Sequence, residues 1–276
     1  TATLSQFPDF FKLETDAVAN LDATFELLQP YVFSNKVKGT WSFSYIRDKQ
    51  KLYLSTIFQN KFAFGFRFAE FTSGFLDWTT QYVQLNKRPN IRPDSTDIDI
   101  LRQLRDLEAQ REQFNSILSF TIQRDKTNDI FSPSRGFIHA WTIEESGLLP
   151  LLLSKWNWVN KPFTQFYRTT LVGRWYFDLT RDRRFSILAL KLRGGWEEKY
   201  GQSRSDTTRA IPQTHRFYAG GGSSVRGWRY RDLSASGNPQ LGGNVLFEGG
   251  VELRTNVLQG LRDDFWDRLW TVLFVD

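Results

Sequence analysis

The chain has 276 residues and a formal net charge of +6, contains no Cys or Met, and is 16% Phe, Trp and Tyr. This aromatic content excludes a disordered chain, and the lack of Cys excludes both a disulfide scaffold and a cysteine-ligated metal site. Acidic and basic residues are interspersed without a polybasic tail, so nucleic acid is not an expected partner.

Strands are the first elements that the sequence predicts. Over residues 39–47, three aromatic residues alternate with Thr and Ser, and over residues 51–68 nearly every even position is apolar while Lys61 and Arg67 occupy odd positions. Successive side chains of a strand point to opposite faces, so each strand has one apolar and one polar face. The same alternation recurs over residues 135–143, 166–178, 185–198 and 244–254.

One connecting segment carries a helical pattern. Apolar residues recur at helical spacing from Ile98 to Leu107, and Asp94 or Ser95 can cap the first turn. The sequence therefore predicts a helical insertion over about residues 94–112, which we interpret as a solvated loop helix. The longest apolar run, residues 147–154, is far shorter than the roughly 18 residues that a membrane-spanning helix needs.

Two folds explain the alternation: a soluble sandwich with one face in its core, or a transmembrane antiparallel barrel. The mean hydropathy of -0.44 fits both, because half of each barrel strand faces a polar interior. Charged residues lie deep inside the polar faces, and Trp, Tyr and Phe gather near strand ends, as in the aromatic girdles of barrels. These two features favour the barrel, although the alternation by itself leaves the sandwich open.

The sequence offers no constellation for catalysis. Its only histidines, His139 and His215, lie in unrelated contexts, without the spacing of metal ligands and without a Gly-x-Ser-x-Gly motif. His139 falls on the apolar face of its predicted strand, where a packed histidine is expected. We therefore predict no catalytic residue, no metal site and no cofactor, and a protein that is not an enzyme.

The long segment 199–243 contains the most informative stretch. This stretch consists of Gly220, Gly221 and Gly222 followed by Val225, Arg226, Gly227 and Trp228. It is not a phosphate-binding loop, because no Lys-Ser or Lys-Thr pair follows, and it is not a dinucleotide fingerprint, because no helix follows. The glycines instead predict a loop whose backbone packs closely against a neighbour and projects Arg226 between small residues.

This stretch resembles the signature loop of the BamA/TamA superfamily of outer-membrane barrel proteins, whose core is Val-Arg-Gly-aromatic. The Pro-x-Arg-Gly pattern at residues 133–136 and the segments 242–254 and 273–276 are similar to the family's other strand motifs, in the same order. The resemblance implies an all-β fold, a transmembrane antiparallel barrel of sixteen strands, of which residues 1–276 cover about ten. Residues 27–30 and 39–59 look most like those of family members from the Bacteroidota and their relatives.

The resemblance also implies roles for particular residues. In the family, the signature loop folds into the barrel lumen, where its Arg contacts an acidic residue on each of the next two strands and an aromatic residue. Carried onto this chain, Arg226 would contact Glu252, Asp276 and Phe274 and would pin the loop inside the lumen. Strand parity agrees, because Glu252 lies on the polar face of its strand, and Phe274 and Asp276 share a face.

The function that the resemblance implies is the folding and insertion of β-barrel client proteins into the outer membrane of Gram-negative bacteria through a lateral gate. The expected partners are outer-membrane lipids and lipopolysaccharide, unfolded β-barrel clients, and accessory lipoproteins or periplasmic assembly factors. The alternatives are a two-partner-secretion pore for a soluble partner, a passive porin, and a soluble ligand-binding barrel. We expect a segment of a longer protein with periplasmic repeat domains outside this chain, because it starts at Thr1 and an open barrel edge cannot lie in lipid.

Overall fold

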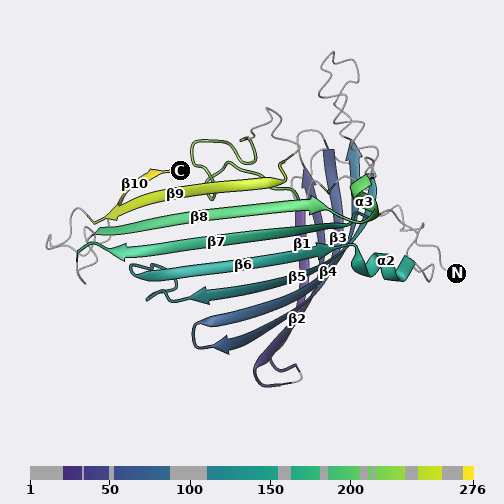
Figure 1. The fold of residues 1–276 in the computed structure, drawn as a ribbon, viewed down its shortest axis with the longest axis horizontal. Helices are drawn as coiled ribbons and strands as arrows, with labels where there is room; N and C mark the ends of the chain where they lie inside the picture. The colour runs from purple at the N-terminus through teal and green to yellow at the C-terminus, as the bar shows by residue number, and fades with distance from the viewer. Residues whose placement is uncertain are drawn as a thin grey trace, which may run out of the picture.

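The described part of the chain forms one antiparallel sheet of ten strands, in which each strand pairs with its neighbours in sequence (Figure 1). The computed structural model describes residues 21–32, 34–49, 53–87, 111–154, 163–180, 186–205, 211–212, 215–233, 242–256 and 270–276. The prediction of about ten antiparallel strands is confirmed. Within these ranges, no helix is long and apolar enough to cross a membrane.

The strands are β1 (Leu21–Gln29), β2 (Val37–Lys49), β3 (Tyr53–Ala69), β4 (Thr72–Lys87), β5 (Glu112–Asp125), β6 (Gly136–Ser146), β7 (Phe166–Asp178), β8 (Ser186–Lys199), β9 (Val245–Thr255) and β10 (Thr271–Val275). Six of the strands, β2, β3, β6, β7, β8 and β9, agree with the predicted alternating segments to within three residues, whereas β1, β4, β5 and β10 were not among those segments. Two short helices, α2 (Leu148–Ser154) and α3 (Gln202–Ser205), lie in the connections that follow β6 and β8. The helix predicted over about residues 94–112 lies almost entirely outside the described residues and stays a prediction; Glu112, at its approximate end, begins β5.

The exposure of the two faces of the sheet is the reverse of that in a soluble protein: the apolar face is exposed and the polar face is buried. Large apolar side chains are exposed, as in Phe25 (61%), Leu171 (57%) and Phe247 (81%), whereas polar side chains such as Gln81 and Glu197 are buried on the opposite face. A sandwich buries its apolar face, but a barrel turns its apolar face outward and its polar face inward. Among the described residues no second sheet covers the apolar face, so this arrangement matches the predicted barrel rather than the sandwich.

Aromatic residues hold neighbouring strands together on the exposed face. Phe25, Trp41, Phe62 and Trp78 come from β1 to β4, and their successive ring centroids lie 6.2, 6.3 and 5.8 Å apart. The strand register places Trp41 opposite Phe62 and Phe62 opposite Trp78. Such cross-strand pairs stabilise a sheet.

The sheet is curved, and the connection between β8 and β9 lies on its concave side (Figure 1). A small group of buried apolar residues, Ile117, Phe166 and Ile211, lies where this connection meets the sheet. Polar side chains such as Gln81, Glu197 and Glu248 are buried as well. The connection therefore contacts the sheet through apolar packing as well as through hydrogen bonds and ion pairs.

Candidate functional site

Residues 215–233, which we call the inner loop, form a hairpin-like excursion before β9. Two isolated bridges hold its stem: Ala219 pairs with Leu233 inside the loop, and Phe217 pairs with Gly243, which lies just before β9. At its tip, the Gly221 N–H donates to the carbonyl of Trp228 over 3.1 Å. These bonds satisfy backbone N–H and C=O groups of the loop that, within the described residues, have no partner in a neighbouring strand.

The glycines at the tip of the inner loop differ in what the fold requires of them. Gly220 and Gly221 both have φ near +101°, and a Cβ at Gly220 would lie 2.5 Å from the carbonyl oxygen of Arg229. A Cβ at Gly222 would meet nothing within 4 Å. Gly227 also has a positive φ of +92°. Only Gly adopts such angles without strain, so the backbone itself requires Gly220, Gly221 and Gly227.

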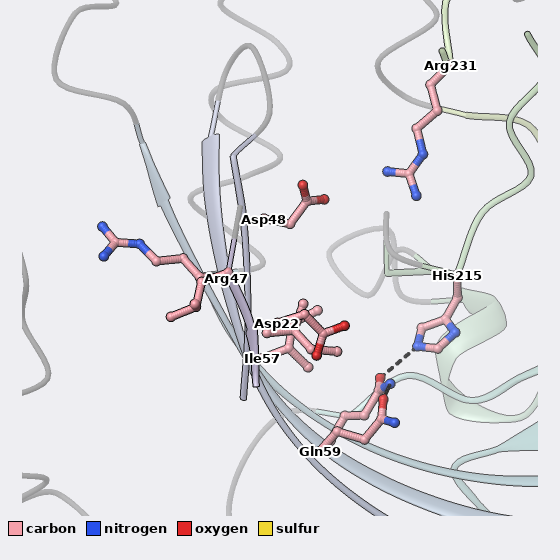
Figure 2. A pocket seen from close by; sticks show the side chains of 10 residues that line it. Asp22, Arg47, Asp48, Ile57, Gln59, His215 and Arg231 are labelled. Atoms are coloured by element: carbon pink, nitrogen blue, oxygen red, sulfur yellow. Dashed lines mark hydrogen bonds between the residues drawn. The ribbon is translucent and has the colours of Figure 1, made fainter. Parts of the chain in front are cut away.

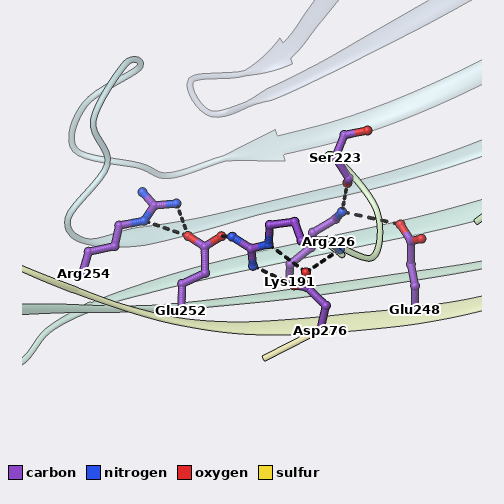
Figure 3. A network of polar contacts seen from close by, with 7 residues as sticks. All are labelled: Lys191, Ser223, Arg226, Glu248, Glu252, Arg254 and Asp276. Carbon is purple, nitrogen blue, oxygen red and sulfur yellow. Dashed lines mark hydrogen bonds and ion pairs between the residues drawn. The ribbon is translucent and has the colours of Figure 1, made fainter. Parts of the chain in front are cut away.

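Arg226 lies at the centre of a polar cluster at the tip of the inner loop (Figure 3). Its Nε and Nη2 donate to Asp276 Oδ2 and Oδ1 over 2.7 and 2.6 Å, and its backbone N–H donates to Oδ2 over 2.9 Å. Its Nη1 donates to Glu252 Oε1 over 2.7 Å, and the guanidinium carbon lies 3.6 Å from the ring centroid of Phe274. The structure thus brings together Arg226, Glu252, Phe274 and Asp276, which we call the Arg226 cluster.

The strand register explains why the cluster forms. Phe274 of β10 lies directly opposite Glu252 of β9, so one arginine can stack on the ring and bond to the acid beside it. Arg254 donates to the other oxygen of Glu252 from Nε and Nη2, over 2.9 and 2.7 Å. Glu252 therefore lies between two guanidinium groups, and the planar fork of each is used.

Hydrogen bonding fixes the charges of the Arg226 cluster. The side-chain hydrogen bonds from Arg226 lower the pKa of Asp276 to about 2. Conversely, the hydrogen bonds to Asp276, and then to Glu252, raise the pKa of Arg226 above its usual value. Both groups are therefore charged at neutral pH, and the pair persists as an ion pair.

Val225 and Trp228 flank the cluster and take no part in its hydrogen bonds. Val225 is half-buried, and Trp228 is exposed. Together with the glycines, they complete the set of residues that the sequence singled out. The side chains that form the cluster are those of Arg226 and its three predicted contacts.

A second polar group beside the cluster was not singled out from the sequence. Glu248 of β9 is almost fully buried and bonds to Arg193 Nη1 over 3.3 Å and to Lys191 Nζ over 3.5 Å (Figure 3). The hydroxyl of Ser224 donates to its other oxygen, and Lys191 donates to the carbonyl of Ser223. Glu248 shares its strand face with Glu252 four residues later, and this parity was the available signal.

His215 connects the start of the inner loop to the opposite side of the sheet. Its Nε2 lies 2.9 Å from Oε1 of Gln81 on β4, beside a cavity of about 380 Å³ (Figure 2). Burial lowers the pKa of His215 to about 4, so the ring is neutral at physiological pH. The cavity walls include Asp22, Arg47 and Arg231.

Among the residues that the structure describes, neither histidine lies in a group of potential metal ligands. His139 stacks on Phe137 and meets Trp175 edge to face, with centroid distances of 4.5 and 5.3 Å. Among the described residues there is no group of three or more His, Cys, Asp or Glu side chains that could hold a metal ion. The Arg226 cluster consists of contacts between the inner loop and strands β9 and β10.

Comparison with known proteins gives one family and one fold. A family model, the Omp85 superfamily domain, matches residues 11–276. The fold is similar to the crystal structure of BamA from Haemophilus ducreyi lacking POTRA domains 1-3, with a TM-score of 0.68 and 13% sequence identity over 93% of this chain and 48% of that chain. At this identity the likeness shows the fold alone, and this chain spans about half the length of that one. No curated protein matches.

Proposed function

Because this chain belongs to the Omp85 superfamily, as its signature loop predicted, we propose that residues 1–276 form part of the barrel of an outer-membrane protein that inserts or translocates other proteins. The exposed apolar face of the sheet would contact lipid and lipopolysaccharide, and the buried polar face would line the interior. The protein would act without covalent chemistry. The similarity to members from the Bacteroidota stays a prediction.

Among the possible cargoes, we favour unfolded β-barrel clients, which would fold at a lateral gate by adding strands to an exposed edge. Accessory lipoproteins or periplasmic assembly factors would deliver them. The observation that carries this choice is the inner loop, which lies on the concave face and is fixed there by the Arg226 cluster. A loop fixed across the interior obstructs the path that a passive porin keeps open, which supports an assembly factor.

The experiment compares client folding by the full-length protein and two variants in lipid vesicles. An unfolded β-barrel client is added, and its conversion to a protease-resistant form is followed over time. Arg226→Ala should slow this conversion about tenfold, which corresponds to about 1.4 kcal/mol. Arg229→Ala is the matched control, because Arg229 lies in the same loop, is exposed, and makes no side-chain hydrogen bond, ion pair or ring contact within the described ranges.

Each alternative predicts a different result in the same vesicles. Client conversion no faster than with empty vesicles overturns the proposed function. Uptake of an unfolded soluble protein into the vesicle lumen, without client folding, identifies a two-partner-secretion pore. A stable large conductance in the wild-type protein identifies a porin. Equal loss of activity in Arg226→Ala and Arg229→Ala contradicts the role assigned to the Arg226 cluster.

A further inference from the structure

The stem of the inner loop carries a second contact with the sheet, at a distance from the Arg226 cluster. Phe217 is only 3% exposed, and the end of its ring lies against Gly195 of β8. A Cβ at Gly195 would lie 2.5 Å from Cε1 of that ring. Glycine is therefore required here by a close approach, since any larger residue would displace the ring.

The neighbouring glycine, Gly194, shows that at this point of β8 only one face is in close contact with an aromatic ring of the described residues. Gly194 points to the opposite face of β8, where a Cβ would meet only the carbonyl oxygen of Leu246, at 4.0 Å. Gly194 and Gly195 are adjacent in β8, and neither has a positive φ. They differ in whether an aromatic side chain of the inner loop occupies the space above them.

Arg168 of β7 covers the ring of Phe217. Its guanidinium carbon lies 4.4 Å from the ring centroid, a distance typical of a cation–π contact. Its Nη1 donates to Glu144 Oε2 of β6 over 3.1 Å, and its Nε lies 4.0 Å from Glu197 Oε2 of β8. The register places Glu144, Arg168 and Glu197 side by side on three consecutive strands, so two carboxylates hold the guanidinium over the ring.

Glu197 makes this contact sensitive to the presence of Arg168. Its side chain has no exposed surface, and neither of its carboxylate oxygens has a hydrogen-bond partner in the part of the chain that the structure describes. Arg216, the residue before Phe217, also interacts electrostatically with Glu197. A buried carboxylate is costly unless cations lie close to it, so Glu197 attracts both Arg168 and the stem of the loop.

We propose that Phe217, seated against Gly195 and covered by Arg168, is a second anchor that positions the inner loop independently of the Arg226 cluster. The bridge between Phe217 and Gly243, with N–O distances of 3.0 and 2.8 Å, transmits the position of the ring to the stem. Arg226 fixes the tip, and Phe217 fixes the base. One consequence rests on the proposed function: client folding needs the loop to be held at both ends.

The test measures docking of the loop with trypsin. Full-length protein is folded into lipid vesicles, and cleavage after Arg229 and Arg231 in the inner loop is followed by mass spectrometry. Protease cleavage needs local unfolding, so its rate reports the fraction of undocked loop. Gly195→Ala should be cleaved about tenfold faster than the wild-type protein. Gly194→Ala, the matched control, should be cleaved at the wild-type rate.

A compensating substitution separates positioning from a general loss of stability. Phe217→Leu removes the ring atoms that a methyl group at residue 195 would meet. The double variant Gly195→Ala/Phe217→Leu should therefore be cleaved more slowly than Gly195→Ala alone. A general weakening of β8 predicts the opposite, since two damaging changes would add.

Folding of each variant is checked by its heat-modifiable mobility on a gel. If Gly195→Ala does not fold, Arg168→Lys replaces it, because Lys keeps the charge near Glu197 but cannot cover the ring with a plane. This variant should be cleaved about threefold faster than the wild-type protein. Equal cleavage of Gly195→Ala and Gly194→Ala, or no relief by Phe217→Leu, overturns the proposal, as does an unchanged rate in Arg168→Lys when that variant is used.

The anchor and the proposed function fail separately. The trypsin assay contains no client, so an unchanged cleavage rate overturns the anchor whatever the activity of the protein. A wild-type protein that folds no client overturns the proposed function and leaves the cleavage result intact.

Discussion

Replacing Arg226 by Lys keeps the positive charge and removes the planar fork, and it should release the tip of the inner loop. The guanidinium donates three side-chain hydrogen bonds, two to Asp276 and one to Glu252, while it lies on the ring of Phe274. An ammonium group is a compact point charge that cannot reach both carboxylates from above the ring. We expect one of the three hydrogen bonds to survive.

The structure limits the size of the effect. A hydrogen bond to a charged group contributes about 1.5–3 kcal/mol, so losing two would cost about 3–6 kcal/mol in a dry site. The side chains of Arg226 and Glu252 are 25% and 22% exposed, so water replaces part of what is lost. Arg254 also continues to neutralise Glu252. The docking free energy of the tip should therefore fall by about 2 kcal/mol, or about thirtyfold in the equilibrium constant.

Hydrogen exchange measures this directly, because the Gly221 amide bonds to Trp228 only when the tip is folded. In full-length protein in vesicles, peptides covering the tip should exchange about thirtyfold faster in Arg226→Lys. Peptides from β5 should not change, and Arg229→Lys should behave as the wild-type protein. If Arg226→Lys exchanges at the wild-type rate while Arg226→Ala exchanges faster, charge alone holds the loop and the argument from fork geometry is refuted.

Three further results are expected. The pKa of Asp276 in the folded protein, about 2, lies below its usual value of 3.8, so its ion pair stabilises the fold above about pH 4 and is lost as the pH falls toward 2. The midpoint temperature of the heat-modifiable transition should therefore drop across this window. A drop of equal size in Asp276→Asn would contradict this assignment. In urea titrations, Gly220→Ala should lower the free energy of unfolding by about 1–3 kcal/mol, and Gly222→Ala should leave it unchanged. Equal effects of the two substitutions would contradict the backbone strain expected at residue 220. Glu248→Gln should cost about 1–3 kcal/mol in the same titration, because it leaves two cations without their shared carboxylate, and an unchanged midpoint would argue against that bridge.

Strand parity is the part of the site that sequence reasoning handles well. Because side chains alternate strictly along a strand, the charged positions of residues 244–254 already placed Glu252 on the polar face. The same rule put Phe274 and Asp276 on one face. Which loop residue meets them does not follow from alternation, and here the resemblance of the signature loop to a known family supplied Arg226.

The second anchor lay beyond this reasoning for a physical reason. Gly195 and Phe217 belong to different elements, and the segment between them has no periodicity from which its path can be predicted. Likewise, His215 and Gln81 are 134 residues apart in sequence. One signal was present: two adjacent glycines inside the strand predicted over residues 185–198, where glycine often marks a close approach of another segment.

Register was the other missing quantity. The ladder of Glu144, Arg168 and Glu197 depends on how β6, β7 and β8 are aligned, and the connections between them are too long to define that alignment as a tight hairpin would. On sequence alone, each of the three is a charged residue on a polar strand face. Only the alignment shows that Arg168 lies between two carboxylates, those of Glu144 and Glu197, and that Glu197 is buried.

The inner loop links strands that hydrogen bonds between neighbours cannot link. In the sheet each strand pairs only with the adjacent ones, but the loop contacts β4 through His215, β7 and β8 through Phe217, and β9 through Arg226. A sheet joined only through neighbours can change its curvature by small rotations at each pair. Contacts from one loop to several strands oppose such rotations together, so the shape of the interior depends on the loop being docked. Gly195 beneath the Phe217 ring, and the glycines at the tip of the inner loop, allow the loop to approach these strands closely enough to make the contacts.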